Sequence, residues 1–110
     1  MRNVEQFLLS PETRTIFEEL PRRLYGSLYR GERAPDGLPF FIVRDSGGEV
    51  FARAAIWTNP EVSYRGETPG LIGSFESIDD LACAKAVLSA AEASIRAAGF
   101  RRVEIGRAHV

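Results

Sequence analysis

The order of elements in the second half of the chain constrains its fold most. A predicted strand from Leu71 to Glu76 is followed by two aspartates, either of which can cap a helix, and then by an alanine-rich stretch that reaches about Ala98. Gly99 supplies a left-handed stop, and Arg102 to Ile105 is predicted to be a short final strand. A strand, a helix and a strand in this order predict a right-handed parallel crossover.

The alanine-rich stretch predicts an amphipathic helix. Its apolar stripe repeats at spacings of three and four residues and consists of Leu81, Ala84, Leu88, Ala91 and Ile95. Polar side chains lie opposite this stripe. One face of the helix is therefore expected to pack on the sheet.

The first half of the chain predicts a helix and a β-hairpin. Ser10, which precedes a proline, marks a helix start. Pro21 should kink this helix or begin a second one, and Gly26 should end it. The apolar runs Phe40 to Val43 and Val50 to Trp57 are joined by a glycine-containing turn. Because both faces of these strands are apolar, we expect an α/β (α+β) domain whose mixed antiparallel and parallel central sheet is flanked by helices on both sides.

Charge and cysteine content exclude several classes of function. Fourteen basic and fifteen acidic residues give a net charge of -1, so no overall field attracts the chain to nucleic acid. Cys83 is the only cysteine, which excludes an internal disulfide and favours a packing role in the reducing cytoplasm. Met1 to Leu9 lacks the apolar region of a signal peptide, and no apolar run approaches the ~20 residues of a membrane span.

One stretch of sequence resembles a known superfamily. The run Gly70 to Asp80 (GLIGSFESIDD), followed by Val87 to Glu92 (VLSAAE) in the element order above, is similar to acyltransferase domains of the GNAT superfamily of N-acetyltransferase-like proteins. The resemblance implies that Leu71 to Glu76 is a central strand that splays from its neighbour and leaves a wedge for acetyl-CoA. It also implies that the helix Leu81 to Ala98 directs its first backbone N–H groups at the pyrophosphate.

The resemblance implies a set of cofactor contacts. The backbone of Gly73, Ser74 and Phe75 would meet the thioester arm. The residues that would open the helix beside the pyrophosphate are Leu81, Ala82, Cys83 and Ala84. No metal cofactor is expected, because one Cys and one His cannot supply the three or four ligands of a zinc site.

The phosphate-binding positions depart from the superfamily pattern. That pattern usually has Arg or Gln, two variable residues, Gly, one variable residue, and then Gly or Ala, whereas Asp79 to Ala84 here reads DDLACA. A carboxylate at this place binds the helix donors itself and repels a phosphate, and Ala82 narrows the approach. Two interpretations stay open. Asp79 and Asp80 are structural caps in a domain that binds CoA weakly or not at all, or backbone donors alone still hold acetyl-CoA.

Two functions follow from these interpretations. The first is an N-acetyltransferase-like protein whose complete form transfers an acetyl group from acetyl-CoA to a small-molecule amine. The alternative is a non-catalytic binding or interaction module with a degenerate CoA site. Neither requires nucleic acid or a membrane as a partner.

Few side chains are candidates for catalysis. Glu76, at the end of the predicted splayed strand, is the catalytic candidate, since a carboxylate there could take a proton from an amine; the alternative is a solvated charge at a strand end. Glu67 precedes the same strand and is a weaker case. Trp57, Tyr64 and Phe75 either line an acceptor pocket or simply pack.

The carboxyl terminus suggests a truncation. Residues Glu104 to Val110 can be encoded by a common sequencing-adapter read, so we expect residues 1–103 to be a partial GNAT-like domain and 104–110 to be a non-native tail. The fragment itself is then expected to be inactive. His109 lies in this tail and is therefore not assigned as a base or metal ligand.

Overall fold

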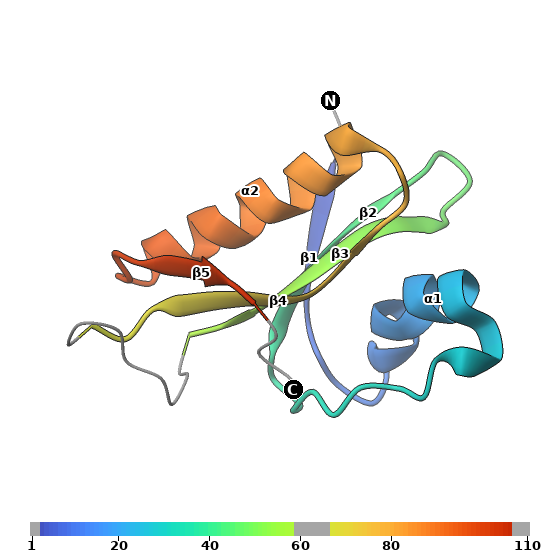
Figure 1. Ribbon diagram of the computed structural model, residues 1–110, viewed down its shortest axis with the longest axis horizontal. Helices are drawn as coiled ribbons and strands as arrows, with labels where there is room; N and C mark the ends of the chain where they lie inside the picture. The colour runs from blue at the N-terminus through green and yellow to red at the C-terminus, as the bar shows by residue number, and fades with distance from the viewer. Residues whose placement is uncertain (1–2, 59–66, 107–110) are drawn as a thin grey trace.

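The computed structural model describes residues 3–58 and 67–106 of the chain, and in these ranges one mixed sheet forms its centre (Figure 1). The strands are β1 (Val4–Leu8), β2 (Pro39–Arg44), β3 (Val50–Trp57), β4 (Gly70–Ser77) and β5 (Val103–Ile105). They lie in the order β1-β2-β3-β4-β5. Neighbours from β1 to β4 are antiparallel, whereas β4 and β5 are parallel. The predicted hairpin, the parallel pairing and the fold class are confirmed.

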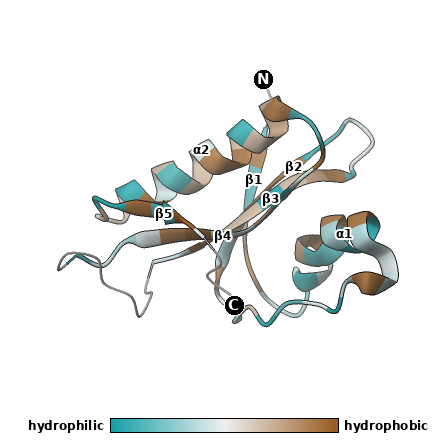
Figure 2. Ribbon diagram, in the orientation of Figure 1, coloured by the Kyte–Doolittle hydropathy of each residue, from teal (hydrophilic) through white to brown (hydrophobic). Residues whose placement is uncertain are grey.

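Helices cover both faces of this sheet. α1 (Arg14–Tyr25), continued by the short 3-10 helix η1 (Gly26–Leu28), packs on one face, and α2 (Leu81–Ala97) lies across the other (Figure 1). Hydrophobic and hydrophilic residues alternate along α2, as an amphipathic helix requires (Figure 2). Each helix packs on a separate hydrophobic core. The core under α2 contains Phe41, Val43, Ala52, Ala54, Ile56, Ile72, Cys83, Val87, Ala91 and Ile95. The core under α1 contains Leu9, Phe17, Leu20, Ala34, Leu38, Phe40, Ile42, Val50 and Ala55.

Helix α1 begins later than predicted and is not divided. Ser10 and Thr13 cap each other reciprocally: the Thr13 N–H donates to Ser10 Oγ at 3.1 Å, and the Ser10 N–H donates to Thr13 Oγ1 at 2.8 Å. Regular helix starts only after this turn and continues through Pro21 to Gly26, where a φ of 55° ends it. The expected end at Gly26 is confirmed, and no second helix begins at Pro21. Pro21 is buried and has no N–H, so one backbone carbonyl of the helix lacks its usual donor. Proline is tolerated here because another side chain bonds that carbonyl, as described below.

Strand β1 was not predicted from the sequence. Val4 pairs with Val43 and Leu8 with Pro39, so β1 is the edge strand next to β2. The residues of β1 are at most partly buried, so no clear alternation of apolar and polar residues marks the strand in the sequence.

The core face of α2 differs from the predicted stripe. Ala91 and Ile95 are buried as expected, but the stripe continues through Val87 and Cys83, and Leu81 is 69% exposed. In the first turn of α2, the face that packs on the sheet is therefore rotated relative to the predicted apolar stripe. At the other end of the helix, Gly70 of β4 lies so close that a Cβ there would come within 2.2 Å of Ile95 Cγ2.

The ends of α2 follow the prediction. The Cys83 N–H donates to Asp80 Oδ1 at 3.1 Å, so Asp80 is the cap, and Gly99 takes a φ of 100°. Within the described ranges, no helix combines the length and the hydropathy needed to cross a membrane.

Candidate functional site

The pairing of β3 with β4 contains a β-bulge. The register shifts between Arg53 and Ala55 of β3, so that Ser74 and Phe75 of β4 together face one residue. Ser74 has a φ of 51° and is the one non-glycine residue with positive φ in the described parts of the chain. A bulge residue in this conformation is ordinarily glycine, because a Cβ is crowded there by the following carbonyl. The bulge therefore interrupts the ladder at the residues that the sequence assigned to the thioester arm.

The parallel pairing of β4 with β5 ends directly before this bulge. Its last residue pair is Ile72 with Ile105, and the Gly106 N–H donates to the Ile72 carbonyl at 2.9 Å. Beyond that point β4 continues to Ser77. In the described residues, the bulge thus follows directly after the last residue pair of β4 with β5.

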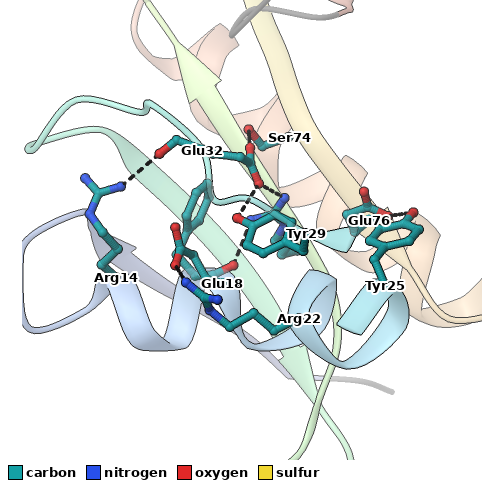
Figure 3. A network of polar contacts seen from close by, with 10 residues as sticks. Arg14, Glu18, Arg22, Tyr25, Tyr29, Glu32, Ser74 and Glu76 are labelled. Atoms are coloured by element: carbon teal, nitrogen blue, oxygen red, sulfur yellow. Dashed lines mark hydrogen bonds and ion pairs between the residues drawn. The ribbon is translucent and has the colours of Figure 1, made fainter. Parts of the chain in front are cut away.

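The side chain of Ser74 joins a buried polar cluster. Its hydroxyl donates to Glu32 Oε2 at 2.6 Å (Figure 3), while Arg53 forms an ion pair with Glu32 Oε1. The Tyr29 hydroxyl also donates to Glu32 Oε1, at 3.2 Å. Only 2% of the Arg53 side chain and 9% of the Glu32 side chain are exposed. One carboxylate therefore gathers three donors from β3, β4 and the segment after η1.

The cluster keeps Glu32 ionised. Burial disfavours its charge, but the attraction of Arg53 and the hydrogen bonds from Ser74, Arg53 and Tyr29 outweigh burial and lower the pKa of the carboxyl. Burial, followed by the nearby charge of Glu32, raises the pKa of Tyr29. A carboxylate with a lowered pKa is a poor proton acceptor, so Glu32 organises donors rather than acting as a base.

The second terminal nitrogen of the Arg53 guanidinium bonds to helix α1. The guanidinium donates from Nη1 to the Phe17 carbonyl at 2.7 Å, and its Cζ lies 4.4 Å from the centroid of the Phe17 ring. In a regular helix that carbonyl would accept from the amide of residue 21. Residue 21 is proline, which has no N–H, so the carbonyl is available to Arg53.

Glu76 lies just after the bulge and is paired with a tyrosine. The Tyr25 hydroxyl donates to Glu76 Oε2 at 2.9 Å (Figure 3). This hydrogen bond, together with the charge of Glu76 and then burial, raises the pKa of Tyr25. Glu76 is half-buried and can be reached from solvent. Glu67 lies before the start of β4 and accepts from Arg101 Nη2 at 2.8 Å, so the structure does not bring it to Glu76.

The predicted cofactor contacts fall into two groups. Gly73 and Ser74 are buried and Phe75 is 37% exposed, so the bulge meets solvent mainly through Phe75. At the start of α2, the side chains of Leu81 and Ala82 are exposed, Ala84 is half-buried, and Cys83 is fully buried. The carboxylate of Asp80 occupies the Cys83 amide, as the sequence predicted, and Asp79 is exposed beside it. This helix start offers a phosphate only backbone donors next to negative charge.

The aromatic residues considered for an acceptor pocket do not form one together. Trp57 lines a hollow of about 460 Å³ with Pro35 to Pro39, Ile56 and Thr58, and it also packs against the core under α1. Phe75 is not among the residues of that hollow. Tyr64 and His109 lie outside the described residues. Among the described residues, no three His, Cys, Asp or Glu side chains gather as metal ligands.

No sequence motif marked Arg53, Glu32 or Tyr29 as site residues. Arg53 carried a signal, since it is the one charge within the apolar run of β3, and a buried charge must be paired. Its partner lies 21 residues away in a loop and has no local mark.

No protein-family profile matches the chain, and no curated protein matches its sequence. Solved structures that match its fold include a candidate acetyl transferase from Pyrococcus furiosus, with a TM-score of 0.65, 14% identity, and coverage of 94% of this chain and 82% of that one. Another is TofI, crystallised in an apo form, with a TM-score of 0.64, 19% identity, and coverage of 94% and 68%. These matches show that the chain shares its fold, which in the described residues is a mixed five-stranded sheet with helices on both faces, with these two proteins.

Proposed function

We propose that this chain forms the acyl-CoA-binding part of an N-acyltransferase that moves an acetyl group from acetyl-CoA to a small-molecule amine. The observation that carries the proposal is the bulge at Ser74 and Phe75. It lies directly after the last residue pair of β4 with β5 among the described residues, on the strand that leads into α2. Bulge amides that leave the regular ladder are suited to hold a carbonyl oxygen.

The reaction requires the protein mainly to position acetyl-CoA and the amine. Acetyl-CoA supplies the activated acyl carbon, which the amine nitrogen attacks while the carbon–sulfur bond breaks and the sulfur leaves on CoA. The backbone amides near Ser74 and Phe75 would hold the carbonyl oxygen and polarise it. Holding both reactants together provides a further large part of the acceleration.

Glu76 is the group proposed to take the amine proton. It follows the bulge by one residue and can be reached from solvent. The Tyr25 hydroxyl orients its carboxylate through the 2.9 Å hydrogen bond. A carboxylate placed in this way can accept the proton that the nitrogen loses on acylation.

The alternative function is a non-catalytic module on the same scaffold. The observation that favours it is at the start of α2, where Asp80 occupies the Cys83 amide and Asp79 places a second negative charge nearby. Both features disfavour the pyrophosphate of CoA. In this case the bulge would bind no thioester.

Calorimetric titration of the 110-residue chain with acetyl-CoA tests the proposal. We expect saturable heat with acetyl-CoA, and weaker heat with S-acetylpantetheine, which keeps the thioester but lacks the pyrophosphate. Phe75→Glu should abolish binding because it places a charge beside the bulge. Leu28→Glu is the matched control, since Leu28 is 82% exposed on η1. A folded chain that gives no heat at millimolar acetyl-CoA would remove the acyltransferase proposal.

Thiol release with a panel of amines separates the two functions once binding is seen. Glu76→Gln should lower kcat about 100-fold or more and leave the affinity for acetyl-CoA unchanged. Glu67→Gln is the matched control because this residue lies before the other end of β4. Turnover of any amine would support the acyltransferase, whereas binding without turnover is the result expected both of an incomplete acyltransferase domain and of the non-catalytic module.

A further inference from the structure

We infer that Glu32 is a positioning residue for the β4 bulge: its carboxylate holds Ser74 in the left-handed conformation through the Ser74 hydroxyl. By doing so it fixes the backbone amides that the acyl carbonyl would meet. The acyl-binding part of this inference rests on the proposed function. The tether from Glu32 to Ser74 does not.

The conformation of Ser74 requires a restraint. Its φ of 51° is disfavoured for every residue with a Cβ. In a bulge of this kind glycine adopts such a φ without a steric cost. A serine there must be held by contacts that the relaxed strand would lose.

The restraint is the hydrogen bond to Glu32. At 2.6 Å the Ser74 hydroxyl donates to an ionised oxygen, and bonds of this charge-assisted type are roughly twice as strong as neutral ones. Side chains of successive residues in a regular strand point to opposite faces of the sheet. If Ser74 returned to an extended φ, its side chain would therefore turn to the other face, away from this acceptor.

Glu32 cannot follow such a movement. Its other oxygen accepts from Arg53 and Tyr29, and Arg53 is held in turn by the Phe17 carbonyl of α1. These contacts come from a strand, a helix and a loop. The bulge is therefore set from the α1 face, through side chains that need not touch the acyl group.

Two substitutions of Ser74 separate the tether from other roles of the hydroxyl. Ser74→Ala and Ser74→Gly both remove the hydroxyl, but only glycine accepts the left-handed φ unaided. In amide NMR spectra of the free protein, we expect Ser74→Ala to shift or split the resonances of residues 73–76. Ser74→Gly should keep one set for Phe75 and Glu76 close to the wild-type positions. Ser27→Ala, on the exposed η1, controls for the loss of a hydroxyl elsewhere. If alanine and glycine move these resonances alike, or if alanine moves none, the tether is refuted.

Ligand preference tests the second half of the inference. CoA lacks the acyl carbonyl, so the ratio of CoA to acetyl-CoA dissociation constants reports the contact between that carbonyl and the bulge. We expect Ser74→Ala to lower this ratio about tenfold, the value of one good hydrogen bond. The ratio should be partly lowered in Glu32→Gln and restored in the Glu32→Gln/Ser74→Gly double variant.

The outcomes distinguish the two proposals. A wild-type chain that binds neither ligand overturns the proposed function and the acyl-binding half of the inference, while the NMR result still decides the tether. A wild-type chain that binds both ligands equally, or equal losses in Ser74→Ala and Ser74→Gly, keeps CoA binding but refutes the positioning role.

Discussion

Arg53 Nη1 donates to the Phe17 carbonyl at 2.7 Å, across the interface between β3 and the middle of α1. The contact exists because Pro21 has no N–H to bond that carbonyl. A residue that ordinarily weakens a helix thus provides the acceptor for a buried arginine. Through Glu32, the same arginine links α1 to the bulge of β4.

The first prediction concerns the buried ion pair. Arg53→Met should lower the free energy of unfolding by about 3–5 kcal/mol, because it leaves the Glu32 carboxylate buried without its counter-charge. Urea denaturation measures this loss. The Arg53→Met/Glu32→Gln double variant should regain part of it, since no uncompensated charge remains. Equal losses in the single and double variants would contradict the assignment.

The second prediction concerns acid. Because the pKa of Glu32 is lowered in the folded protein, its stabilising effect is present above the unfolded pKa and is lost as pH falls through the folded pKa. The difference in unfolding free energy between wild type and Glu32→Gln should therefore be largest near neutral pH and shrink as the solution becomes more acidic. Urea midpoints across an acid series measure it. A difference that stays constant with pH would show that the charge of Glu32 has no part in the effect.

The third prediction concerns the contact between β4 and α2. Gly70→Ala should destabilise the protein by about 1–3 kcal/mol, because the new Cβ would overlap Ile95 Cγ2 at 2.2 Å. Thermal unfolding measures the change. Gly47→Ala is the matched control, since its nearest neighbour, Asp45 Oδ1, would be an ordinary 3.6 Å away. Similar losses in both variants would argue against the close approach.

The fourth prediction concerns the charge at the start of α2. Asp79→Asn should tighten acetyl-CoA binding about two- to fivefold, because removing a like charge near a phosphate is worth ~0.3–1 kcal/mol. The gain should shrink as salt is added. Titration at two ionic strengths measures it, with the exposed Glu12→Gln as control. A gain that is independent of salt would rule out the electrostatic cause.

Local signals predicted most of the elements. The glycine-containing turn between two apolar runs marked the hairpin, and the aspartate cap and Gly99 bracketed α2 correctly. Strand β1 was missed because Glu5 and Gln6 interrupt its apolar residues, and an edge strand gains its pairing from β2 rather than from its own pattern.

The candidate site was predicted only in part. The resemblance located Gly73 to Phe75, but a bulge depends on the register between two strands, and sequence distance does not encode that register. Pairing of Arg53 with Glu32 likewise requires the fold to bring two distant segments together. Arg53 interrupts the apolar run of β3 and a buried charge needs a partner, but the sequence does not say which carboxylate serves.

The burial of Cys83 has a practical consequence. The chain has one thiol, which is fully buried beneath the first turns of α2. Thiol reagents reach it only when α2 separates from the sheet by local unfolding, so the rate of alkylation reports the local unfolding of this helix. The protein therefore carries its own reporter of local unfolding, at the end of the helix that leads away from the bulged strand.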